Sequence, residues 1–234
     1  MSESIVIIDY NIGNLRSVQK SFEKNDCDAI ITNNHEKILN ADKIVLPGVG
    51  SFRDGMNGLL NLGLVEVLNE AVIYNKKPFL GICLGMQCAV IEYARNILNM
   101  PGANSTEMKP NTKFPVIDIM EEQKEITNKG GTMRLGLYEA KLKHNSLIKN
   151  IYKSSSIKER HRHRYEVNNN LKNKFEEKGM IFSGMSPDNQ LPEIIELKNH
   201  PWFIGVQFHP EFKSRPLAPH PLFSSFIKAA KNHK

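Results

Sequence analysis

The chain has 234 residues, of which 40% are hydrophobic and 24% are charged, with a formal net charge of +6 at pH 7. These values are typical of a globular protein with a sizeable core, and the lack of linker-like stretches favours a single domain over residues 1–234. No apolar run has membrane-spanning length and no basic-then-apolar leader opens the chain, so we expect a cytoplasmic protein without a membrane partner.

The three cysteines, Cys27, Cys83 and Cys88, are an odd count without framework spacing, which argues against a secreted disulfide scaffold. No Cys/His cluster has zinc spacing, so we expect no metal and no cofactor. Basic residues concentrate in segments 158–164 and 228–234. Aromatic residues are not interleaved with them and no nucleic-acid motif appears, so we expect no nucleic-acid partner.

Apolar runs and amphipathic segments alternate through the first hundred residues. Four continuous apolar runs predict strands that are buried on both faces: residues 4–10, 29–32, 43–46 and 78–82. Three segments with helical periodicity predict helices: residues 15–24, 56–74 (with a break near 61–63) and 86–98. The alternation predicts the α/β class, with a doubly wound sheet and helices on both faces.

The second half of the chain is less regular at first. Residues 100–135 are interpreted as an excursion or lid. Beyond it, four strands are predicted, of which we expect the last three to be antiparallel: residues 137–143, 180–183, 193–197 and 203–208. Two helices complete the prediction: residues 171–177 and 222–231. The sheet is therefore mixed, and its reactive site is expected at the carboxyl ends of the parallel strands.

A glycine-flanked cysteine stands at one of these strand ends. Residues 81–87 read Gly-Ile-Cys-Leu-Gly-Met-Gln, with an apolar run before them and a predicted helix after them. This layout indicates a nucleophile elbow, in which small residues let a tight turn hold a reactive atom above the sheet. A thiol at a helix start is also favoured as thiolate. The alternative is a buried structural cysteine in a glycine-rich loop.

The predicted strand 203–208 ends in His209, Pro210 and Glu211. A thiol, an imidazole and a carboxylate are the parts of an activated-nucleophile relay, in which His209 takes the proton of Cys83 and Glu211 holds the imidazole tautomer. The backbone N–H groups of Leu84 and of the turn at Gly48 and Val49 are the candidate oxyanion donors. The alternative is that His209 is an ordinary histidine at a strand end.

Residues 81–87 together with 207–211 (Gln-Phe-His-Pro-Glu) resemble the class I, or triad, glutamine amidotransferases, and the resemblance spans essentially the whole chain. Members of that family hydrolyse the side-chain amide of glutamine through a glutamyl thioester and pass ammonia to a synthase. The resemblance implies an enzyme with Cys83 as nucleophile, His209 as base and Glu211 as orienting acid. It also implies glutamine as substrate and a separate ammonia-accepting synthase subunit or domain as partner.

Different parts of the chain resemble two different members of the family. Residues 1–80 look like the glutaminase subunit of imidazole glycerol phosphate synthase, in three segments: 7–17, 46–52 and 63–66. Residues 88–234 look like the glutaminase domain of CTP synthase, in six segments: 89–95, 103–107, 130–136, 159–169, 200–203 and 214–223. Both families share the elbow sequence, so the chain reads as a mosaic with a seam near residues 81–88.

Glutamine carries an ammonium and a carboxylate, so its pocket needs groups of opposite charge. Resemblance to the CTP synthases implies that Glu107 contacts the amino group, Arg164 the carboxylate, and Gln87 the region near the substrate. On residue type alone, Glu107 and Arg164 are more typical of solvated loop charges. The same resemblance suggests GTP as a nucleotide effector that acts through Arg134 and residues 121–129.

The sequence defines the synthase partner less well than it defines the glutaminase chemistry. No phosphate-cradling glycine-rich loop of a synthetase domain is present in this sequence. We therefore rank first a glutaminase subunit of the imidazole glycerol phosphate synthase type, which serves histidine biosynthesis. The first alternative is the glutaminase domain of a CTP synthase, which serves pyrimidine nucleotide biosynthesis, without its synthetase domain. The second alternative is a non-catalytic module that docks on a synthase or senses glutamine.

Overall fold

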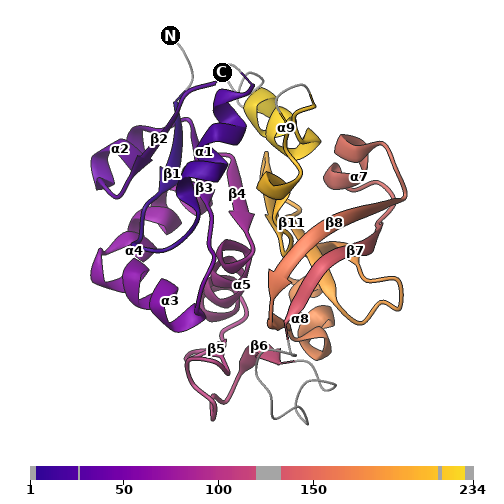
Figure 1. Ribbon diagram of the computed structural model, residues 1–234. Coiled ribbons are helices and arrows are strands. Elements are labelled where there is room, and N and C mark those ends of the chain that lie inside the picture. Colours follow the sequence, from indigo (N-terminus) through magenta and orange to yellow (C-terminus); the bar gives the residue numbers. More distant parts are fainter. Residues whose placement is uncertain (1–3, 26, 120–132, 216–217, 230–234) are drawn as a thin grey trace.

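A computed structural model describes residues 4–25, 27–119, 133–215 and 218–229 (Figure 1). Nine strands of this described part form one sheet: β1 (Ile5–Ile8), β2 (Ala29–Thr32), β3 (Lys43–Leu46), β4 (Phe79–Ile82), β7 (Arg134–Leu142), β8 (Ser156–His163), β10 (Met180–Met185), β11 (Pro192–Leu197) and β12 (Phe203–Val206). They are ordered β2-β1-β3-β4-β12-β11-β10-β7-β8.

Helices cover both faces of this sheet. They are α1 (Leu15–Glu23), α2 (His35–Asn40), α3 (Phe52–Asn61), α4 (Leu64–Leu68), η1 (Asn69–Tyr74), α5 (Leu84–Asn96), α7 (Leu147–Tyr152), η3 (Asn169–Leu171), α8 (Lys172–Glu177), η4 (Pro210–Phe212) and α9 (Pro221–Ala229). Within the described ranges, no helix has the length and apolar character needed to cross a membrane.

The buried strands divide the core into two layers because successive side chains of a strand point to opposite faces. In β1, Val6 and Ile8 join the cluster that includes residues of α3, α4 and α5, whereas Ile5 and Ile7 join the cluster that includes residues of α1 and α9. The predicted α/β class, with a doubly wound mixed sheet and helices on both faces, is confirmed.

The sheet changes direction at β12. On one side of β12 every neighbouring pair is parallel, along the order β2-β1-β3-β4-β12. On its other side every neighbouring pair is antiparallel, along the order β12-β11-β10-β7-β8. The expectation that residues 203–208 pair in antiparallel fashion holds only toward β11. Toward β4 the pairing is parallel, with Val206 opposite Ile82. The carboxyl ends of β4 and β12 therefore lie side by side, which brings His209 next to Cys83.

Several boundaries differ from the predicted ones. Helix α3 begins at Phe52 because Ser51 Oγ accepts a hydrogen bond from Asp54 N at 3.1 Å, a standard amino-terminal cap. The predicted break near 61–63 is present, with Gly63 in the left-handed conformation. Part of the predicted excursion, β5 (Asn104–Ser105) and β6 (Pro115–Ile119), forms a small second sheet with β9 (Tyr165–Val167), which comes later in the chain. Residues 120–132 lie outside the described part of the chain.

The basic run at 158–164 lies almost entirely in β8, a strand that was not predicted. Its side chains alternate: Glu159, His161 and His163 are buried, whereas Arg160 and Arg162 are exposed. Although β8 is four places from β12 in the sheet, the backbone N–H of His209 donates to the carbonyl oxygen of Arg160 at 2.9 Å. The antiparallel half of the sheet therefore folds back onto the end of β12.

Candidate active site

Cys83 lies in a strained turn between β4 and α5. Its φ of 52° and ψ of −105° are unusual for a residue with a side chain. A Cβ atom added to Gly85 would lie 1.8 Å from the carbonyl oxygen of Leu46, and one added to Gly81 would lie 3.0 Å from Met86 N. The turn can therefore close only with glycine at position 85, as the elbow motif predicts. It leaves Cys83 5% exposed at the start of α5.

His209 and Glu211 form a hydrogen-bonded pair, with 2.8 Å between His209 Nδ1 and Glu211 Oε1. The imidazole is completely buried, and its Nε2 has no nitrogen or oxygen partner in the described part of the chain. Burial lowers the pKa of His209, but hydrogen bonding and charge interaction with Cys83 and Glu211 outweigh burial and raise this pKa to about 10. The ring of Phe212 stacks on the imidazole at 4.7 Å between centroids.

The predicted oxyanion donors lie next to each other. A Cβ atom added to Gly48 would lie 2.6 Å from Leu84 Cβ, so the turn after β3 closely approaches the start of α5. None of the hydrogen bonds found among the described residues uses the backbone N–H of Val49 or Leu84. These two N–H groups are thus not engaged by the hydrogen bonds of the described residues, and their role as oxyanion donors stays a prediction.

The predicted substrate-binding residues gather around Tyr165. Gln87 Nε2 donates to the carbonyl oxygen of Tyr165 at 2.9 Å, and Tyr165 directly follows Arg164. Glu107 Oε2 accepts the backbone N–H of Phe52 at 3.0 Å. Burial raises the pKa of Glu107, while the Phe52 hydrogen bond and the nearby charge of Arg164 partly counteract burial. The structure therefore brings the carboxylate, the guanidinium and the amide into one region.

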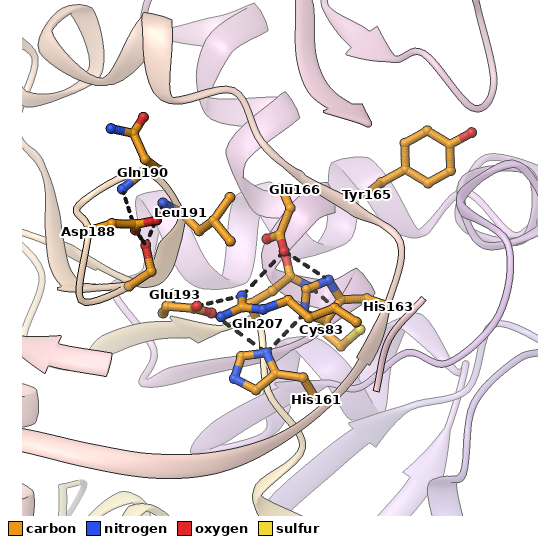
Figure 2. A network of polar contacts seen from close by, with 12 residues as sticks. Cys83, His161, His163, Tyr165, Glu166, Asp188, Gln190, Leu191, Glu193 and Gln207 are labelled. Atoms are coloured by element: carbon orange, nitrogen blue, oxygen red, sulfur yellow. Dashed lines mark hydrogen bonds and ion pairs between the residues drawn. The ribbon is translucent and has the colours of Figure 1, made fainter. Parts of the chain in front are cut away.

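A buried polar network behind Cys83 was not predicted (Figure 2). Arg134 Nη1 lies 2.5 Å from Glu193 Oε1 and 3.3 Å from Glu166 Oε1. His161 Nδ1 lies 2.9 Å from His163 Nε2. Burial and nearby positive charge lower the pKa of His161 to about 2 and that of His163 to about 3, so both rings are neutral. Burial raises the pKa of Glu193 to about 7 despite Arg134.

This network bears on the suggested effector site. The side chain of Arg134 is 7% exposed and lies between two carboxylates, so it is not presented to solvent. Residues 121–129, the other part of that suggestion, lie outside the described residues. In the ranges that the structure describes, no group of three or more His, Cys, Asp or Glu side chains could hold a metal ion.

The site has the parts of an acyl-transfer centre. A thiol on a strained turn lies beside an imidazole whose other nitrogen is held by a carboxylate, and the turn after β3 packs against Leu84 at the start of α5. The interactions with Cys83 and Glu211 favour the imidazolium form of His209, and an imidazolium beside a thiolate is the reactive form of such a centre. Opposite charges at Glu107 and Arg164 suit a substrate with an ammonium and a carboxylate.

Known proteins are similar to this chain in sequence and in fold. The family model described as Glutamine amidotransferase class-I matches residues 6–229. The CTP synthase of Pelagibacter ubique is 61% identical over 207 residues, covering 85% of this chain and 37% of that protein. The CTP synthase of Clostridium perfringens is 52% identical over 211 residues, covering 87% and 39%. This chain thus spans less than two fifths of these relatives. Their similarity also reaches beyond residues 88–234 into the amino-terminal part.

Solved structures of this fold are similar to the chain as well. The glutaminase domain of Trypanosoma brucei CTPS with bound acivicin superposes with a TM-score of 0.85 at 29% identity, covering 99% of this chain and 94% of that one. A Thermoplasma acidophilum protein described as a GMP synthase component superposes with a TM-score of 0.67 at 16% identity, and at that identity it shows the fold alone.

Proposed function

The chain belongs to the class I glutamine amidotransferase family, and from this premise we propose that it hydrolyses glutamine to glutamate and ammonia with Cys83, His209 and Glu211. The observation that carries the proposal is the geometry of the three residues. His209 Nδ1 lies 2.8 Å from Glu211 Oε1, and the interactions with Cys83 and Glu211 raise the pKa of the imidazole to about 10.

The reaction follows from these positions. The thiolate of Cys83 attacks the amide carbon of glutamine, and the oxyanion that forms accepts hydrogen bonds from the N–H groups of Val49 and Leu84. Imidazolium at His209 gives its proton to the departing nitrogen, which leaves as ammonia. The thioester remains on Cys83. His209 then takes a proton from water, the resulting hydroxide attacks the thioester, and glutamate leaves with return of the thiolate. Glu107 and Arg164 hold the amino and carboxylate groups of the substrate.

For the ammonia acceptor, we favour a CTP synthase synthetase domain. On sequence alone the imidazole glycerol phosphate synthase partner ranked first, but the curated relatives above are CTP synthases with 52% or higher identity over more than four fifths of this chain. Mixing the chain with that synthetase domain, ATP, UTP and glutamine carrying heavy amide nitrogen should place the label in CTP. Label only in the product of an imidazole glycerol phosphate cyclase subunit would reverse this choice. The GTP effector and the seam near residues 81–88 stay predictions.

Glutamate release from glutamine, measured with an enzyme-coupled assay, tests the glutaminase proposal. We expect release by the wild-type chain, alone or with a synthetase domain, and its loss in Cys83→Ala and His209→Ala. Glutamine binding without Cys83-dependent release under both conditions would overturn the proposal in favour of a sensing module.

A further inference from the structure

Gln207 contacts the nucleophile but has no role in the mechanism above. It directly follows β12, is completely buried, and lies two residues before His209. Its Nε2 donates to Cys83 Sγ at 3.6 Å, and its Oε1 accepts from Gln87 Nε2 at 3.2 Å. Figure 2 shows Gln207 and Cys83 beside the buried polar network.

The orientation of the Gln207 amide follows from its partners. The two ends of a glutamine amide look alike, so their assignment must come from hydrogen-bond logic. Gln87 Nε2 lies 2.9 Å from the carbonyl oxygen of Tyr165, which can only accept. The nearer end of the Gln87 amide is therefore NH₂. The Gln207 atom that faces this NH₂ must be oxygen, and the remaining end of Gln207, its NH₂, faces Cys83 Sγ.

A donor that cannot turn away favours the charged form of the sulfur. A thiolate accepts a hydrogen bond far better than a thiol, and a bond to an ionised partner is roughly twice as strong as a neutral one. The site is nearly dry, with Cys83 5% and Gln207 0% exposed, so water does not replace this donor at low cost.

We propose that Gln207 is a further donor to the nucleophile: it holds Cys83 as a thiolate, and the Tyr165 carbonyl fixes its orientation through Gln87. The proposal deepens the proposed function and rests on it for the meaning of the thiolate. It also changes the role of Gln87, whose NH₂ is engaged by Tyr165 and Gln207. Because Tyr165 is adjacent to Arg164, the relay joins the substrate-carboxylate side of the site to the sulfur.

Alkylation of Cys83 by iodoacetamide measures the thiolate without requiring glutamine turnover. The rate is followed from pH 5 to 10 by mass spectrometry on the full chain. Cys88 lies on the same tryptic peptide and serves as an internal reference, because burial, the first of several causes, raises its pKa to about 12. A failure of the proposed glutaminase activity would leave this readout intact, so the two failures are distinguishable.

Gln207→Met keeps the side-chain length and removes the amide. We expect the alkylation profile of Cys83 to move up by about one pH unit, which makes alkylation about tenfold slower on the acid side. Glutamine turnover should lose kcat with little change in KM. Gln207→Glu, which replaces the donor by a carboxyl group, should move the profile in the same direction. Gln19→Met is the matched control: Gln19 lies in α1, away from Cys83, and its Nε2 donates to the backbone carbonyl oxygen of Ala29 at 2.7 Å. Its profile should equal that of wild type.

The outcome that overturns the proposal is a Gln207→Met profile that superposes on wild type while thermal unfolding shows a folded protein. If Gln207→Met does not fold, Gln87→Met decides instead. It removes the partner that orients Gln207, so a smaller upward shift of the profile is expected, and an unchanged profile rejects the relay.

Discussion

Arg134 is the only cation in contact with two carboxylates in the described part of the buried network, so its replacement is a sharp test. Arg134→Met keeps much of the apolar stem and removes the guanidinium from Glu193 and Glu166, whose side chains are 0% and 4% exposed. Removal of one partner from a buried ion pair costs about 3–5 kcal/mol, because the remaining charge is buried without compensation. For a chain of this size, about 4 kcal/mol lowers Tm by roughly 8 °C or more.

The loss of stability expected for Arg134→Met depends on pH. Burial raises the pKa of Glu193 from 4.5 to about 7 in the folded protein. A carboxyl group with a raised pKa holds its proton more tightly when folded, so wild-type stability declines as the pH rises from about 4.5 to about 7. Without Arg134 the pKa of Glu193 rises further, and the decline continues to higher pH. The difference in Tm between Arg134→Met and wild type should therefore be larger at pH 8 than at pH 5.

Thermal unfolding followed by calorimetry at both pH values is the assay. Arg16→Met is the control, because Arg16 pairs with Glu23 on the surface at 3.0 Å and its side chain is 62% exposed. Such pairs contribute about 0–1 kcal/mol, so its Tm should stay within about 4 °C of wild type. An Arg134→Met protein that unfolds within that margin at pH 8 would refute the reasoning on the network.

Three further changes address the site. Glu211→Gln leaves the imidazole of His209 without its negatively charged partner, and kcat for glutamine hydrolysis should fall by a factor of about 10²–10⁴ with little loss of Tm; unchanged kcat would exclude an orienting role. Gly85→Ala places a methyl group against the Leu46 carbonyl, so we expect no measurable activity and a lower Tm, and a fully active variant would contradict the described turn. Glu107→Gln should raise KM for glutamine about tenfold or more by loss of a charged hydrogen bond, with kcat less affected; a change confined to kcat would place Glu107 outside the amino-group site.

The parallel half of the fold could be predicted because its strands are short apolar runs that need no partner to be recognised. The turn at Cys83 could be predicted as well, since glycine is required where the Cβ of residue 85 would meet the Leu46 carbonyl. In the same way, Pro210 marks the strand end that presents His209. These signals are local in the sequence and can be recognised without knowledge of the tertiary structure.

The rest depends on contacts between distant residues. Strand β8 was missed because three of its four buried positions hold Glu159, His161 and His163, and only Ile157 is apolar. The two histidines are buried as neutral rings in one network with Arg134, on the neighbouring strand β7, and its carboxylate partners. Helices α2 and α7 have six residues each, too few for helical periodicity to be decisive. Gln207 belongs to the sequence motif at residues 207–211, but its contact with Cys83 depends on the pairing of β12 with β4.

A covalent glutamyl thioester on Cys83 tests the central claim most directly. The full chain is mixed with glutamine, quenched in acid during turnover and digested, and the peptide that contains Cys83 and Cys88 is fragmented in the mass spectrometer. We expect a glutamyl adduct on Cys83, none on Cys88, and none in Cys83→Ala. Glutamate release by the wild-type chain with no adduct on Cys83, or equal release by Cys83→Ala, would contradict the account.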